Sequence, residues 1–470
     1  MHCIESAFRS YATAAALVAF SPSWIWCQQI PSDKQQAEEE SIGDAVRAED
    51  NAIAAHPEAG TGDKTEALAV HPPIHILYVH GIDQVGAGDS LPLRKGICKY
   101  LGECTVTSIG RVYADGPFAV DSEPPTAALV GKPIWKSKDE WSASAPFIDR
   151  YEMKGNGHTP ILLDEFNWWP LAYPLKCKWL IARDALLTGT PKPQLSVCAT
   201  PTTPDPAHPK RYLSYQWIEN SEASELNHIK RRAKILNRSL KNGLMDWGFA
   251  DAVMALGPME DVLSAGIREL LIRSLQPPVR NANTPATTVD GEVFFVTHSL
   301  GSYLALIALN TDLLGSDNPD LSGFQMTPEQ KQAADYFSAH TAEFYFLANQ
   351  IALLQLAWVS SPTGHHSDPC SASAEKSGSQ SIAHWLCKRD TYLSERPSVA
   401  PVPQIVAWSD PNDLLSWEVP QIDGVRVVNI KVQNPGFKLS PFIGSPTSAH
   451  ANYAKNRKVL RLILKPSPQH

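Results

Sequence analysis

The sequence predicts an α/β protein with a mainly parallel sheet flanked by helices. Two observations support this fold class. Short apolar runs typical of buried strands, such as residues 74–79 and 293–296, alternate with stretches of helical period. Hydrophobic residues make up 43% of the 470 residues, which is enough to form a large core around such a sheet.

The first 27 residues differ in composition from the rest of the chain. Residues 11–26 are mostly apolar or small, Arg9 precedes them, and a polar, acidic stretch follows. This pattern is typical of a secretory signal and is short for a membrane span, so we expect membrane contact only through this leader. Residues 28–70 have no apolar period, which predicts a disordered linker, and the folded domain is expected over residues 71–470.

The cysteines favour an oxidising, extracytoplasmic location, either periplasmic or secreted. Six of the eight cysteines remain when Cys3 and Cys27 are set aside as part of the leader. Each neighbouring pair brackets a short segment rich in Gly, Pro or Ser, which suits disulfide-closed loops. Six unrelated buried thiols in a cytosolic enzyme are the alternative. By proximity we expect the pairs Cys98 with Cys104, Cys177 with Cys198, and Cys370 with Cys387.

The charge of the chain excludes a nucleic-acid partner. The net charge is −8, so no basic field is available to hold a phosphate backbone. The densest basic run, residues 230–241, contains regularly spaced apolar residues and is interpreted as a solvated helix face. We therefore expect a small-molecule partner, and the composition leaves the oligomeric state open.

The order of the predicted elements leaves room for a large insertion. Residues 91–101 read as a helix closed by Gly102. More than two hundred residues then separate His80 from Ser299, whereas one βαβ unit needs only about 30. We expect residues 111–289 to form a cap insertion over the C-terminal edge of the sheet, with an aromatic middle at residues 161–187 and a helical end at residues 226–275.

The C-terminal third is predicted to alternate between helices and strands. Two strands are expected at residues 403–408 and 425–432, and the segment 360–381 is irregular. Helices are expected at residues 342–358 and 453–464.

The residues Thr297-His298-Ser299-Leu300-Gly301 predict a strand, a sharp turn and a helix with a serine at the turn. A serine hydroxyl becomes a nucleophile when it is lifted clear of the backbone, given a base and set beside oxyanion donors. Gly301 has no side chain to collide with the strand, and the amide of Leu300 falls near the helix N-terminus. Thr297 occupies the position where the usual G-x-S-x-G pattern has its first glycine.

An acid and a histidine follow this serine in the chain. The predicted strand at residues 403–408 runs into a turn with two aspartates, and we prefer Asp413 as the acid because it stands after the turn and before an apolar pair. Asp410 could instead cap the turn. His450 lies on a predicted loop before the last helix. Upstream, Gly81 follows the first strand, so the amide of Ile82 is the natural second oxyanion donor, with His80 orienting the loop.

On these residues the chain resembles the α/β-hydrolase superfamily, of the serine esterase and lipase kind, over about residues 74–110 and 290–465. The serine, acid and histidine follow one another in the order that the family uses. The resemblance implies a nucleophile at Ser299, a base at His450 oriented by Asp413, and an oxyanion hole of Ile82 and Leu300 amides. The strands that usually precede the His-Gly strand are absent from the sequence, so we allow for a sheet reduced at its N-terminal strands.

The function implied is cleavage of a carboxylic ester through an acyl-enzyme, with no cofactor and no metal. The Trp-rich insertion favours a lipophilic acyl or aromatic substrate. Thioesterase, amidase and acyltransferase activities would use the same triad, and a non-catalytic binding protein with this fold is a further alternative. A rival metal cluster at His365, His366, Asp368 and Cys370, with His384 and Cys387 beyond, fits no standard zinc spacing and is interpreted as a surface loop.

Overall fold

The computed structural model describes most of the unit Pro72–His470. The expected leader and linker, residues 1–27 and 28–70, lie outside the described residues. So do most of residues 182–247 and all of residues 355–377. Apart from short gaps, the described residues are 74–82, 88–126, 128–129, 132–155, 160–181, 204–205, 208–212, 245, 248–276, 292–310, 324–354, 378–395 and 403–464.

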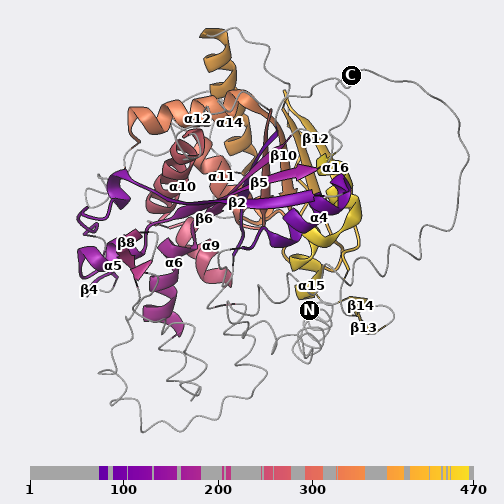
Figure 1. Ribbon diagram of the computed structural model, residues 1–470. Helices are drawn as coiled ribbons and strands as arrows, with labels where there is room; N and C mark the ends of the chain where they lie inside the picture. Colours follow the sequence, from indigo (N-terminus) through magenta and orange to yellow (C-terminus); the bar gives the residue numbers. More distant parts are fainter. Residues whose placement is uncertain are drawn as a thin grey trace, which may run out of the picture. The chain divides into compact units, whose positions relative to one another are not determined.

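Eight strands form one sheet in the described part of the chain, in the order β12-β11-β10-β9-β1-β6-β5-β2 (Figure 1). The strands from β12 to β6 pair in parallel, whereas β5 is antiparallel to β6 and β2 is antiparallel to β5. The predicted mainly parallel α/β sheet is confirmed. The strands are β1 Ile74–Val79, β2 Cys104–Tyr113, β5 Phe147–Gly155, β6 Ile161–Asn167, β9 Glu292–His298, β10 Thr341–Leu347, β11 Gln404–Ser409 and β12 Arg426–Lys431.

The segment expected as a cap insertion contributes strands to this sheet. Both β5 and β6 fall within residues 111–289, and β6 pairs directly with β1. The cap interpretation is therefore wrong for these strands, and the sheet is not reduced, because three strands lie on that side of β1 and all of them follow it in the chain. The charged residues Arg150, Asp164 and Glu165 interrupt the apolar pattern of these strands, although all three are buried.

A second correction concerns residues 342–358, which were expected to form one helix. The segment begins as the strand β10 and continues as the short helix α13, Ile351–Leu354. Every residue of β10 is buried. Phe344 and Phe346 belong to one core cluster, and Tyr345 to the other. Because both faces of β10 are covered, the strand lacks the alternation of polar and apolar residues by which a half-buried strand is recognised.

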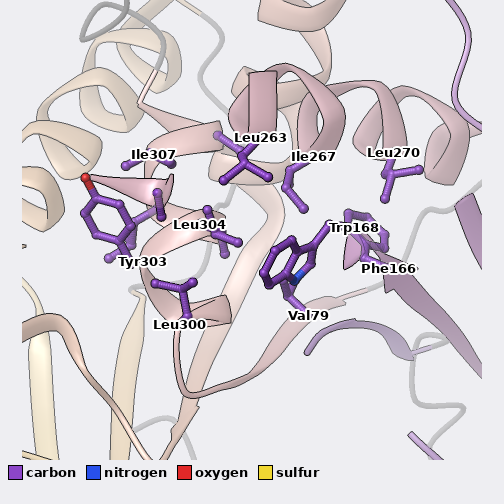
Figure 2. Packing of buried hydrophobic residues seen from close by; sticks show 14 of the residues in the cluster. Val79, Phe166, Trp168, Leu263, Ile267, Leu270, Leu300, Tyr303, Leu304 and Ile307 are labelled. Atoms are coloured by element: carbon purple, nitrogen blue, oxygen red, sulfur yellow. The ribbon is translucent and has the colours of Figure 1, made fainter. Parts of the chain in front are cut away.

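Helices cover the two faces of the sheet. One core cluster joins the sheet to α10 (Glu260–Leu275), α11 (Gly301–Leu309) and α12 (Pro328–His340), and the other joins it to α4 (Leu91–Leu101) and α16 (Arg457–Leu464). In Figure 2, Leu263 and Ile267 of α10 face Leu304 of α11 and Trp168. This packing holds the beginning of α11 against the end of β1.

The remaining elements are short or lie at the periphery. The predicted helix at residues 91–101 is confirmed as α4, and Gly102 follows it with a φ of 78°. The expected final helix is divided into a 3₁₀ turn and α16. The other elements are η1 Gly116–Phe118, β3 Ala128–Leu129, β4 Lys132–Pro133, α5 Lys138–Ala143, α6 Trp169–Leu175, η2 Lys176–Ile181, β7 Pro204–Asp205, β8 His208–Tyr212, α9 Ala250–Ala255, α14 Gly378–Glu395, β13 Lys438–Ser440, β14 Ile443–Gly444, α15 Pro446–Ala451 and η8 Tyr453–Lys455.

One of the expected disulfides lies wholly within the described residues. Cys98 of α4 is bonded to Cys104, the first residue of β2. Cys177 and Cys387 are also disulfide-bonded, and their expected partners, Cys198 and Cys370, lie outside the described residues. A search of the described helices for one with the length and apolar character of a membrane span found none.

Candidate active site

Ser299 lies at a sharp turn between β9 and α11. Its φ is 53°, in the left-handed region, which costs a residue with a side chain about 1–3 kcal/mol. The amide of Ser299 donates to the carbonyl of Leu347 at 2.8 Å, which helps to hold the turn. A Cβ atom on Gly301 would overlap the backbone of Val79, so glycine is required where α11 crosses the end of β1. The backbone thus presents Ser299 in a strained conformation.

Thr297 is accommodated at the end of β9 although it replaces the glycine of the usual pattern. Its side chain is buried, and its hydroxyl donates to the carbonyl of Tyr345 at 3.3 Å. The same hydroxyl lies 2.9 Å from the hydroxyl of Ser302. Because the polar group has partners on both sides, a β-branched residue fits this elbow without leaving an unsatisfied hydroxyl.

Three side chains from distant parts of the sequence meet at this turn. The Nε2 atom of His450 lies 3.2 Å from the Oγ atom of Ser299. The Nδ1 atom of His450 lies 2.9 Å and 3.1 Å from the two carboxylate oxygens of Asp413. Asp413 follows β11, as expected, whereas His450 belongs to the short helix α15 and not to a loop. The structure therefore brings the three predicted residues into one hydrogen-bonded chain.

The carboxylate of Asp413 is held by further donors. The amide of Leu415 donates to one oxygen at 2.9 Å, and the hydroxyl of Tyr453 donates to the other at 3.0 Å. Burial alone would raise the pKa of Asp413, but hydrogen bonds from His450, Leu415 and Tyr453 outweigh it and lower the pKa below its ordinary value. Asp413 is therefore ionised at neutral pH. Sequence reasoning missed Tyr453, which it placed only at the start of a helix.

Asp410 has a different set of contacts. Its carboxylate accepts hydrogen bonds from the amide and side chain of Asn412, at 2.8 and 3.0 Å, and from the amide of Asn434 at 2.6 Å. These bonds close the turn after β11 and tie it to the segment after β12. Of the two aspartates considered from the sequence, Asp413 is the one that contacts His450, and Asp410 caps the turn.

The turn after β1 packs directly against Ser299. A Cβ atom on Gly81 would lie 2.6 Å from the Cβ atom of Ser299 and 2.8 Å from the carbonyl oxygen of His298. Glycine therefore lets the backbone before Ile82 approach the serine. Leu300, the residue before α11, is in the first turn of a helix, where amides have no partner within the helix. Both residues expected to supply oxyanion donors thus belong to segments that adjoin Ser299.

His80 is buried beneath this turn and held by Trp168. Their rings are stacked with centroids 4.8 Å apart, and the indole nitrogen of Trp168 donates to the carbonyl of His80 at 2.9 Å. Burial lowers the pKa of His80 to about 3, so the ring is neutral. Trp168 follows β6, and its aromatic neighbourhood was expected to form a cap. Its contact with the turn was missed because nothing in the sequence places β6 beside β1.

The members of the site differ in exposure. Ser299 is completely buried, whereas the side chain of His450 retains 17% of its exposure. The solvent-facing part of the site is therefore on the His450 side. The rival cluster of metal-ligand residues cannot be placed, because His365, His366, Asp368 and Cys370 lie outside the described residues.

Comparison with known proteins gave no match to this chain. No family model matches it, and neither a curated protein nor a solved structure is significantly similar to it. What the site can do is therefore argued from its own geometry.

Proposed function

We propose that this protein is a serine hydrolase of the α/β-hydrolase kind that cleaves a carboxylic ester through an acyl-enzyme. The observation that carries the proposal is the hydrogen-bonded chain from Ser299 through His450 to Asp413, with contacts of 3.2 and 2.9 Å. Each atom in it is the one that the chemistry requires, because the base contacts the serine through Nε2 and the acid through Nδ1. The positive φ of Ser299 and the close approach of Gly81 add support.

The proposed reaction follows from the role of each group. Ser299 Oγ attacks the acyl carbonyl carbon while its proton passes to His450 Nε2, and the carbonyl oxygen becomes an oxyanion facing the amides of Leu300 and Ile82. The carbon–oxygen bond to the leaving alcohol then breaks, and His450 returns the proton to that alcohol. Water, deprotonated by His450, attacks the acyl-enzyme and releases the acid. Asp413 stays ionised throughout and stabilises the imidazolium.

The substrate class is inferred from the apolar side chains at the site. Three tryptophans of the expected cap, Trp135, Trp141 and Trp168, are buried in the core, so they give little support for a lipophilic substrate. Leu414, the neighbour of Asp413, is 67% exposed. Leu414 adjoins Asp413 in the sequence, and this exposed apolar side chain is the feature on which we propose an apolar acyl or aromatic group. Thioesters and acyl transfer to another alcohol would use the same groups.

We also propose an extracytoplasmic location. The Cys98–Cys104 disulfide and the disulfide-bonded Cys177 and Cys387 support it, because disulfides persist mainly in oxidising compartments.

Labelling with a fluorophosphonate tests the proposed function. Wild-type protein is expected to label, and Ser299→Ala and His450→Ala are expected to lose labelling. Ser338→Ala is the matched control, because Ser338 is also buried but bonds Trp385 at a distance from the site, and it should label like wild type. Absence of labelling in the wild type, or persistent labelling of Ser299→Ala, rejects the proposal and favours a non-catalytic binding protein. Initial rates on matched oxygen esters and thioesters then separate the two hydrolase activities.

A further inference from the structure

His298 connects the nucleophile strand to the backbone of the base. It is the last residue of β9 and immediately precedes Ser299. Its Nε2 atom lies 2.9 Å from the carbonyl oxygen of His450. The two imidazole rings lie with centroids 5.1 Å apart and are tilted by 55°. The ring of His298 thus links the strand that carries Ser299 to the backbone of His450.

The protonation state of His298 follows from its partner. A carbonyl oxygen can only accept a hydrogen bond, so Nε2 of His298 must carry a proton. Burial and the neighbouring His450 both lower the pKa of His298, which makes the ring neutral and leaves Nδ1 without a proton. A Cβ atom on Gly81 would lie 3.0 Å from this Nδ1 atom. His298 therefore lies between the backbone of His450 and the glycine turn after β1.

Two loop residues also help to hold His450 and the residue before it. Asp413 holds its ring, and the side-chain amide of Asn434 donates to the preceding carbonyl, that of Ala449, at 2.6 Å. Asp413 and Asn434 belong to loops that follow strands. His298 instead belongs to the central strand that also carries Ser299, so its hydrogen bond ties the base to the nucleophile without passing through a loop.

We propose that His298 is a positioning residue whose Nε2–H bond to the His450 carbonyl keeps the base within reach of Ser299. This inference rests on the proposed function. Loss of the bond would free α15 to shift, and a displacement of about 1 Å at a catalytic group can cost about a hundredfold in rate. The bond does not touch the acyl group, so loss of it should lower kcat and the labelling rate while KM changes little.

A pair of variants of similar size isolates the hydrogen bond. His298→Gln can place an amide N–H near the position of Nε2, whereas His298→Met fills the space without a donor, and His298→Leu serves if the methionine variant does not fold. The matched control is His340→Met. His340 also donates from its ring to a backbone carbonyl, that of Tyr336 at 2.8 Å, but it ends α12 just before the first residue of β10, whereas Ser299 follows the last residue of β9 at the other end of the parallel strands.

The measurements are the second-order rate of fluorophosphonate labelling, kcat and KM on a short soluble p-nitrophenyl ester, and thermal unfolding. His298→Met is expected to lower kcat and the labelling rate by about tenfold to a hundredfold, with KM within about twofold. His298→Gln should recover most of the loss, and His340→Met should match wild type. Wild-type rates in His298→Met, or equal losses in the Met and Gln variants, would overturn the inference. Wild-type protein that fails to label rejects the proposed function itself, and the role of His298 falls with it.

Discussion

Two aspartate–histidine pairs among the described residues have nearly the same contact distance, one inside the sheet and one beyond the ends of its strands. At the C-terminal ends of the strands, Asp413 and His450 are 2.9 Å apart. Inside the sheet, Asp164 of β6 and His75 of β1 are 3.0 Å apart. An Asp–His contact alone therefore does not identify an active site. The surroundings of the two pairs decide what each can do.

The inner pair, Asp164 and His75, is bonded to the buried cation of Arg150. Arg150 donates to both carboxylate oxygens of Asp164, at 2.6 and 2.9 Å, and also to the carbonyl of Gln276 at 2.7 Å, at the end of α10. Burial alone would raise the pKa of Asp164, but Arg150 and His75 lower it well below its ordinary value. His75 is 2% exposed, and its Nδ1 atom has no hydrogen-bond partner among the described residues. This pair joins two strands and a helix, and its geometry is structural.

The outer pair is left open on one side. Among the described residues, the donors to Asp413 besides His450 are the amide of Leu415 and the hydroxyl of Tyr453, and both are neutral. The second ring nitrogen of His450 faces Ser299, and the ring keeps part of its exposure. A histidine whose second ring nitrogen faces a hydroxyl can act as its base, whereas the second ring nitrogen of His75 makes no such contact in the described part of the chain.

The largest expected effect comes from substitution of the outer aspartate. Asp413→Asn should lower kcat by about 10⁴-fold, because the amide no longer stabilises the imidazolium or fixes its tautomer. The free energy of unfolding should fall by only about 1–2 kcal/mol, since the side chain keeps its size and most of its hydrogen bonds. Ester hydrolysis and urea unfolding measured on the same protein test this. Unaltered kcat would place the acid elsewhere.

For the inner aspartate, Asp164, we expect the opposite result: a large loss of stability and an unchanged labelling rate. Asp164→Asn leaves the buried Arg150 without its counter-charge, which should cost about 3–5 kcal/mol of unfolding free energy. The molecules that remain folded should label at the wild-type rate. Asp335→Asn, which breaks the exposed Lys331–Asp335 pair, should cost no more than about 0.5 kcal/mol and serves as control. A slower labelling rate in folded Asp164→Asn would show that the inner pair also serves the site.

The sequence predicted the outer pair better than the inner one. Ser299, Asp413 and His450 each stand beside a recognisable strand or turn signal, and their order in the chain was informative. Asp164 and Arg150 lie in strands that were not recognised, because a charge inside a strand removes the apolar alternation unless its partner is known. The contacts of His298, Tyr453 and Trp168 depend on which strands are neighbours, and strand order cannot be read from local pattern.

Removal of one donor to the outer aspartate gives a smaller effect. Tyr453→Phe loses the hydroxyl that donates to Asp413 at 3.0 Å and accepts from the amide of Asp410 at 2.7 Å. We expect a loss of about 1–3 kcal/mol in unfolding free energy. Loss of this hydrogen bond should also raise the pKa of Asp413, because the Tyr453 hydroxyl helps to lower it, and the acid side of the kcat/KM profile should move to higher pH. A loss of stability with an unchanged pH profile would restrict Tyr453 to a structural role.

The smallest expected effect concerns Glu165, the chain neighbour of Asp164, whose hydrogen bonds among the described residues come from neutral donors. Glu165 accepts from the amides of Gly88 and Asp89 at 2.7 and 3.0 Å and from the hydroxyl of Ser90, just before α4. Burial raises the pKa of Glu165 to about 7, although these hydrogen bonds oppose the shift. Two adjacent acids thus have opposite pKa shifts, because Arg150 bonds Asp164 directly, whereas Glu165 is bonded by neutral donors and has Asp89 and Asp149 near it.

The raised pKa of Glu165 determines how the unfolding free energy changes with pH. Between the ordinary pKa of glutamate and about 7, the folded state binds more protons than the unfolded state, so unfolding free energy falls as pH rises. Wild type should lose about 1 kcal/mol between about pH 6 and about pH 8 relative to Glu165→Gln, which has no proton to lose. Urea unfolding of both proteins at these two pH values measures the difference. Equal slopes would mean that the amides of residues 88–90 keep Glu165 ionised in the folded protein.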